Sequence, residues 1–179
     1  MKPIYEPKGA AKEYGDYALN IYTGCPHRCY YCFAPQVLHR DRETFHSCVE
    51  PRRDIVGKLR RQLEREQITG ELIHLCFACD PYPTGYDTTV TREVISLLKE
   101  HGNHIQILTK GDGRRDFDLL DENDWYGVTI DGGITPVEQV HIRRMPAFRF
   151  SPCQHTAQLH ESNPAPYPAI KQARRKSTF

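Results

Sequence analysis

The chain has 179 residues, a formal net charge of +1, 39% hydrophobic and 26% charged residues. These values are typical of a globular domain with a buried core, and the near-neutral charge argues against a strongly electrostatic nucleic-acid binder. No apolar run is long enough to span a membrane, and the N-terminus lacks the apolar stretch of a secretory signal, so we expect a cytoplasmic protein. In the cytoplasm, seven cysteines favour metal binding or catalysis over disulfides.

Short apolar runs alternate along the chain with amphipathic segments. Residues 1–17 are polar and predict an extended lead-in. Strands are predicted at 18–23, 72–77, 105–109 and 126–130. One helix is predicted to begin at Pro51 and to include the apolar stripe that ends at Leu63, a second helix is predicted at 91–101, and a helical turn is predicted at 116–120. This alternation predicts an α/β fold of parallel βα units, with ligands bound beyond the carboxyl ends of the strands.

The pattern stops after the fourth strand. Residues 131–179 show no sustained period, contain six prolines between 136 and 168, and end in the basic segment KQARRKSTF. Such a segment offers too little apolar surface to offset its ordering entropy. We therefore predict a core at 18–130 followed by an irregular basic tail, and we expect the uncovered fourth strand to favour self-association or a partner chain.

Three cysteines, Cys25, Cys29 and Cys32, lie in one polar loop directly after the first strand. Thiolates are soft ligands that suit iron–sulfur clusters, and three of them leave one iron of a cubane open to another ligand. Zinc is the alternative, because four further residues could supply a fourth ligand. These residues are His27, His39, His46 and Cys48.

The CxxxCxxC spacing, with Tyr31 before the third cysteine, resembles the signature of the radical S-adenosylmethionine (SAM) superfamily. The resemblance implies a partial (β/α) barrel, of which about four βα units are present. It also implies a [4Fe–4S] cluster whose open iron binds SAM, reductive cleavage to methionine and a 5′-deoxyadenosyl radical, and a flavodoxin- or ferredoxin-like electron donor.

Further blocks resemble the spore photoproduct lyase branch of this superfamily, often called DNA repair photolyase. They are 20–34, 79–83, 107–111, 115–120 and 125–130. This resemblance implies a lyase that acts on nucleic acid. The chain has fewer βα units than cores of this superfamily usually contain, so a truncated, catalytically silent iron–sulfur or zinc-binding module is the alternative.

The resemblance also implies roles for residues at the strand ends. Tyr31 would pack beside the adenine of SAM, Asp80 would bind its amino group, Lys110 would approach its carboxylate, and Thr129 would contact the ribose or carboxylate. Each has an ordinary structural alternative: a packing tyrosine, an Asx turn, a solvated charge and a packing strand residue. Tyr30 and Phe33 are further candidates for the adenine wall.

The remaining cysteines have less definite interpretations. Cys76 lies in an apolar strand and is predicted to be a core residue. Cys79 is a candidate catalytic thiol, because a thiol near the substrate could return a hydrogen atom to a substrate radical. Cys48 and Cys153 have no predicted partner.

Overall fold

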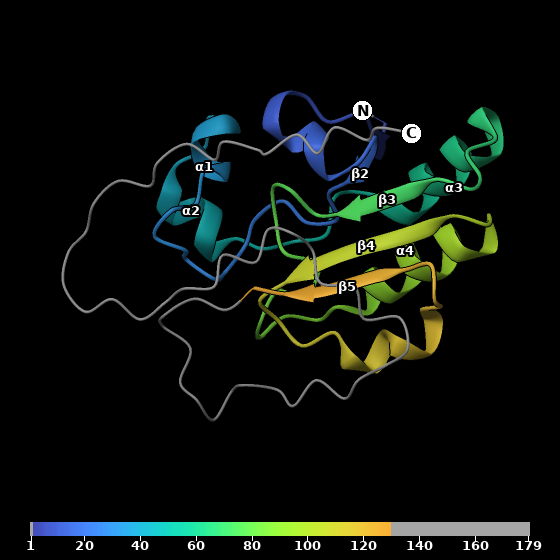
Figure 1. Ribbon diagram of the computed structural model, residues 1–179. Helices are drawn as coiled ribbons and strands as arrows, with labels where there is room; N and C mark the ends of the chain where they lie inside the picture. The colour runs from blue at the N-terminus through green and yellow to red at the C-terminus, as the bar shows by residue number, and fades with distance from the viewer. Residues whose placement is uncertain (1, 130–179) are drawn as a thin grey trace, which may run out of the picture.

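The computed structural model describes residues 2–129, which form an α/β fold around one open sheet (Figure 1). The strands are β1 (Ile4–Tyr5), β2 (Tyr17–Leu19), β3 (Leu72–Leu75), β4 (His104–Thr109) and β5 (Trp125–Val128). They are ordered β1-β2-β3-β4-β5, with β1 antiparallel to β2 and the three other pairs parallel. The predicted α/β fold class, a partial barrel of parallel βα units, is confirmed, and the predicted tail at 131–179 lies outside the described residues.

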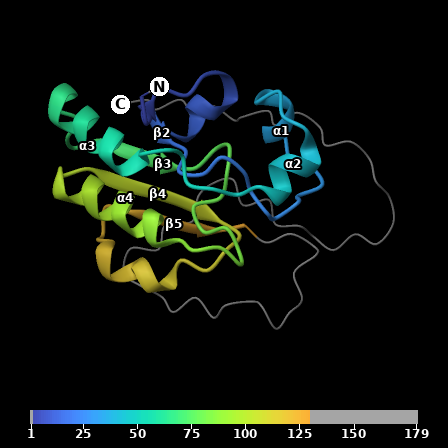
Figure 2. The ribbon, with the colours of Figure 1, turned by 180° about the vertical axis from the view of Figure 1, so that it is seen from behind.

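Two long helices cover one face of the sheet, as Figure 2 shows. They are α3 (Ile55–Glu66) and α4 (Thr89–Glu100), and two 3₁₀ helices lie at Gly9–Tyr14 and Arg114–Leu119. The short helices α1 (Ala34–Val37) and α2 (Arg42–Ser47) lie instead beyond the carboxyl ends of the parallel strands (Figure 1). The sheet edge that the sequence associates with ligands is therefore the edge next to α1 and α2.

Several local features differ from the sequence expectation. The lead-in contains β1 and a 3₁₀ helix, and the Gln62 side chain holds Ile4 by accepting from its N–H at 2.8 Å and donating to its carbonyl at 2.9 Å. Helix α3 begins at Ile55 rather than at Pro51, because Asp54 adopts a left-handed backbone conformation. Short elements such as β1 and α2 carry no periodic signal, so sequence patterns do not reveal them.

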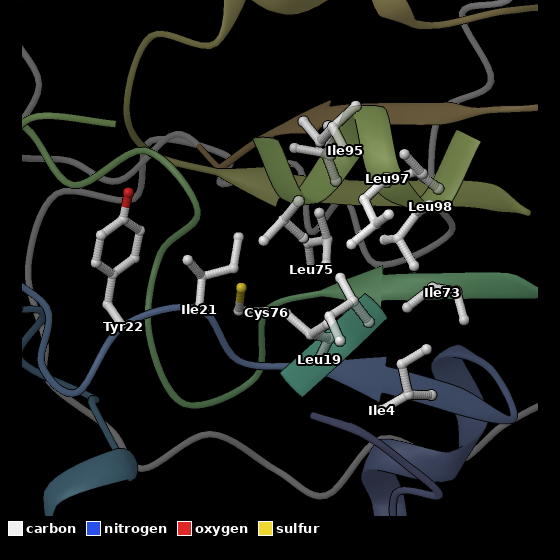
Figure 3. Packing of buried hydrophobic residues seen from close by; sticks show 14 of the residues in the cluster. Ile4, Leu19, Ile21, Tyr22, Ile73, Leu75, Cys76, Ile95, Leu97 and Leu98 are labelled. Carbon is white, nitrogen blue, oxygen red and sulfur yellow. The ribbon is translucent and has the colours of Figure 1, made fainter. Parts of the chain in front are cut away.

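The main core lies between the sheet and the two long helices (Figure 3). Ile73 and Leu75 of β3 are fully buried there with Ile95 and Leu98 of α4. Replacing such a residue by alanine typically costs about 2–5 kcal/mol. This packing gives the loops at the carboxyl edge a rigid base.

The opposite face of the sheet carries polar and aromatic side chains. Because successive strand residues point to opposite faces, His74 lies on the other side of β3 from Ile73 and Leu75. Its Nδ1 lies 3.1 Å from Oε1 of Gln106, and its ring stacks on Phe77 at 4.2 Å between centroids. Burial lowers the pKa of His74 to about 4, so this imidazole is neutral near pH 7.

Candidate metal and cofactor site

The cysteine loop follows β2 and packs closely against α2. A Cβ at Gly24 would collide with the carbonyl oxygens of Phe45 and Cys48, so only glycine allows this approach. The Cys25 N–H donates to the Phe45 carbonyl at 3.2 Å, and the Cys32 N–H donates to the Cys29 carbonyl at 3.0 Å. The loop is thus a folded turn around its three thiols.

All three cysteines are half-buried, and none of them forms a disulfide with another described residue. Their sulfurs do not form a group whose ligand atoms all lie within 4.8 Å of one another. A soft, three-sulfur donor set on one loop suits an iron–sulfur cluster.

Metal binding at this loop requires loss of the thiol protons. Burial raises the pKa of Cys25 to about 12, although a contact with the His27 backbone lowers it. A thiol with so high a pKa binds metal only if the metal displaces its proton. Metal affinity at Cys25 is therefore coupled to pH.

Side chains from residues 40–46 donate hydrogen bonds to the loop carbonyls. Arg40 donates to Thr23. Arg42 donates to the carbonyls of Cys29 at 2.7 Å and of Tyr30 and Cys32 at 3.3 Å each. Nδ1 of His46 lies 2.7 Å from the Cys25 carbonyl.

The three donors were not predicted as a group. His46 was considered only as a zinc ligand, and its Nε2 is buried without a hydrogen-bond partner among residues 2–129. The only sequence signal is that Asp41 can cap the helix that carries Arg42 and His46; its Oδ1 accepts from the Thr44 N–H at 2.8 Å.

Asp80 is the polar centre of the strand-end loops. Its buried carboxylate accepts from the Tyr82 N–H at 2.8 Å, the Thr109 hydroxyl at 2.5 Å and the Lys110 N–H at 2.8 Å. The bond to Tyr82, two residues on, is the Asx turn considered above. The carboxylate therefore ties the loop after β3 to the end of β4, and its contact with SAM stays a prediction.

His27 joins the cysteine loop to this centre. Its Nδ1 lies 3.3 Å from Oδ2 of Asp80 and 3.8 Å from Sγ of Cys25, and its Nε2 lies 3.0 Å from Oγ1 of Thr84. The side chain is only 11% exposed. In the sequence His27 was considered only as a zinc ligand, so its link to Asp80 was missed.

Two further predicted cofactor residues lie side by side. The Lys110 ammonium is 5.5 Å from the centroid of the Tyr31 ring, and Tyr31 is 52% exposed. Thr129 lies at the same edge, where its N–H donates to the Thr109 carbonyl at 2.8 Å. The predicted site residues thus come together from the loop after β2 and the ends of β3, β4 and β5, and their roles stay predictions.

Of the other candidates, Cys76 is buried as predicted (Figure 3). Cys79 is half-buried, and its Sγ accepts from the Tyr22 N–H at 3.4 Å. Burial opposes ionisation of Cys79, but hydrogen bonds from Cys76 and the Tyr22 backbone lower its pKa. Tyr30, Phe33 and Cys48 are exposed, and Cys153 lies outside the described residues.

A second group of possible metal ligands lies where β4 begins. His104, Asp121 and Asp124 place their ligand atoms within 4.8 Å of one another. The Lys99 ammonium already pairs with Asp121 at 2.6 Å and with Asp124 at 2.7 Å. This group is therefore a salt-bridge network.

Comparison with known proteins gives one family match. The model of the "Radical SAM superfamily" matches residues 19–144. Uncharacterised proteins of Mycobacterium bovis and of two strains of Mycobacterium tuberculosis are each 33% identical over 112 residues. The match covers 59% of this chain and 33% of each relative, so the chain spans about a third of the length of these relatives.

No solved structure gave a significant match. Within the part of the chain that the structure describes, no helix has both the length and the apolar character needed to cross a bilayer.

Proposed function

Because the chain belongs to the radical SAM superfamily, we propose that it holds a [4Fe–4S] cluster through Cys25, Cys29 and Cys32 and binds SAM beside it. The observation that carries this proposal is the placement of the loop. It lies at the carboxyl edge of a parallel sheet, with the Lys110 ammonium facing the ring of Tyr31. That edge is where ligands bind in open α/β sheets.

The residues around the loop suit the parts of SAM. Lys110 supplies a positive charge for the methionine carboxylate, and a charge-assisted contact of this kind contributes about 1.5–3 kcal/mol. The half-exposed Tyr31 offers a ring face for the adenine. Thr129 is our candidate for the ribose or carboxylate.

Asp80 is our candidate for the methionine ammonium. Its Oδ2 accepts from the Lys110 N–H at 2.8 Å and lies 3.3 Å from Nδ1 of His27. The same carboxylate orients Lys110, our candidate for the neighbouring carboxylate of the methionine moiety. Asp80 therefore combines a charge partner for SAM with a positioning role for the loop.

When bound, the cluster supplies one electron to the sulfonium of SAM, which yields methionine and a 5′-deoxyadenosyl radical. The chain's own residues hold SAM in one orientation next to the three thiolates. Cys79 is our candidate for a hydrogen-atom donor, because its half-buried thiol lies on the loop that also carries Asp80.

The test is anaerobic reconstitution with iron and sulfide, reduction in the presence of SAM, and assay of 5′-deoxyadenosine and methionine. We expect both products in equal amounts, together with a change in the electron paramagnetic resonance spectrum when SAM is added. The matched control is Cys29→Ala. A cluster without SAM cleavage would favour a silent iron–sulfur module, and zinc in anaerobically prepared protein would favour a structural zinc site.

At a finer level we propose a lyase of the spore photoproduct lyase kind that acts on nucleic acid and is reduced by a flavodoxin- or ferredoxin-like protein. The support is the series of sequence blocks at the strand ends, within the proposed core at 18–130. The test is repair of ultraviolet-irradiated DNA with SAM and reduced flavodoxin. Cleavage of SAM without loss of photoproduct would overturn this substrate while leaving the radical chemistry intact.

A further inference from the structure

Residues 40–46, which follow the cysteine loop in the chain, fold back against it. Arg40, Arg42 and His46 bond to the carbonyls of residues before, between and at the three cysteines. Arg42 makes most of these hydrogen bonds, because it donates to the carbonyls of Cys29, Tyr30 and Cys32. A guanidinium can do this because it presents several N–H donors in one plane.

The position of Arg42 is itself fixed. It is the first residue of α2, whose start is capped by Asp41 through bonds to the Thr44 N–H and hydroxyl, each 2.8 Å long. The same helix places His46 one turn later, against the Cys25 carbonyl. One short helix therefore holds both ends of the loop.

The charge of Arg42 has no carboxylate partner among residues 2–129. Arg28, within the loop itself, differs in this respect, because its guanidinium pairs with Glu43 at 2.5 Å. Both side chains are largely exposed. The two arginines can therefore be compared directly: Arg42 donates to carbonyls of the cysteine loop, whereas the charge of Arg28 is neutralised by a carboxylate.

We propose that Arg42 is a positioning residue for the cluster loop, and that its charge stabilises the reduced, more negative form of the cluster. The proposal rests on the proposed function, since it needs the cluster. Its physical basis is that groups behind the ligands set ligand orientation, and that net charge and hydrogen bonding set the reduction potential. A nearby cation favours the state with the extra electron.

Two variants separate geometry from charge. Arg42→Lys keeps the charge but loses the planar set of donors, whereas Arg42→Gln keeps a short donor and loses the charge. Arg28→Gln is the matched control. An unchanged urea unfolding midpoint for all three would show that the fold is intact, which we expect because these side chains are exposed.

The first readout is amide hydrogen exchange of residues 25–32. We expect both Arg42 variants to exchange at least about ten-fold faster than the parent in this segment, and the Arg28 variant to match the parent. Exchange by mass spectrometry does not depend on activity. Unchanged exchange in both Arg42 variants would overturn the positioning role.

The second readout is the midpoint potential of the reconstituted cluster, measured by anaerobic redox titration. We expect a lower potential in Arg42→Gln, a smaller shift in Arg42→Lys, and no shift in the double variant Arg28→Gln with Glu43→Gln, which removes both members of an ion pair and leaves the net charge unchanged. A purely structural role would give equal shifts in the two Arg42 variants, and that outcome would overturn the charge role. Failure of the proposed function is a separate result, because the parent chain itself would then bind no [4Fe–4S] cluster.

Discussion

Lys110 and Tyr31 meet across the carboxyl edge of the sheet, with the ammonium 5.5 Å from the centre of the ring. Lys110 directly follows β4 and Tyr31 lies between two cysteines, so the contact joins the loop to the strand beside which SAM is proposed to bind. A cation near an aromatic face contributes about 0.5–1 kcal/mol at an exposed site. The contact places both groups beside the cysteine loop.

Lys110→Ala is expected to weaken SAM binding about ten- to a hundred-fold, because a charge-assisted contact with the carboxylate is lost. The cluster should remain. The measurement is a titration of the reduced cluster with SAM, followed by electron paramagnetic resonance. Lys58→Ala, which removes from α3 an ammonium bonded to the Arg53 carbonyl, is the control. Equal affinities in the two variants would contradict the role of Lys110.

Replacing any of Cys25, Cys29 or Cys32 by alanine is expected to abolish iron–sulfur absorbance after anaerobic reconstitution, because two thiolates cannot hold a cubane in place. Cys48→Ala is the control, since this exposed thiol lies just after α2. Iron and sulfide content per chain is the measurement. Full iron content in the Cys29 variant would refute the ligand assignment.

Asp80→Ala is expected to lower both stability and SAM affinity. The substitution leaves the N–H groups of Tyr82 and Lys110 and the hydroxyl of Thr109 without their acceptor. Unsatisfied buried groups cost about 1–3 kcal/mol each before relaxation. Urea unfolding measures the first effect and SAM titration the second.

Asp87→Ala is the control for this experiment, because that exposed carboxylate caps only Thr89 and should cost about 1 kcal/mol or less. A stability loss at Asp80 no larger than at Asp87 would show that its bonds contribute little.

Stability is expected to fall as the pH drops from about 6.5 towards 4, partly because of His74. The unfolded imidazole takes up a proton near pH 6.5, whereas burial lowers the folded pKa to about 4, so acid favours the unfolded chain. The contribution is on the order of 3 kcal/mol. Urea unfolding of the parent and of His74→Gln at pH 7 and pH 5 measures it. Identical pH dependence in the two proteins would refute the assignment.

Lys99→Met is expected to destabilise the fold by about 3 kcal/mol, because it leaves the buried carboxylate of Asp124 without its ammonium. The loss should be smaller at low pH, because the Lys99 ammonium lowers the pKa of Asp121 in the parent, and the stability that this gives is lost as the Asp121 carboxylate is protonated. Thermal unfolding at pH 7 and pH 4 is the measurement, with Lys2→Met as the control because the Lys2 side chain in the Lys2–Glu66 pair is 63% exposed. Equal losses in the two variants would show that the Asp124 pair contributes no more than a surface pair.

Part of this architecture follows from the sequence alone. The alternation of apolar runs with amphipathic segments predicted β3, α4 and β4 close to their observed bounds, because burial on one or both faces leaves a local, periodic pattern. The cysteine spacing is equally local, since Cys25 to Cys32 occupy one loop. That the candidate residues share one edge also follows, because parallel strands end on the same side.

The contacts between the segments were decided only by the tertiary structure. Three contacts illustrate this: His27 with Asp80, Arg42 with the loop carbonyls, and Lys110 with Tyr31. They join residues that are far apart along the chain or that lie on short helices. Such contacts depend on where α1 and α2 turn back beyond the sheet, and helices of one or two turns have no periodic signal. Their positions are set by packing and hydrogen bonding against the loop, which exist only in the folded chain.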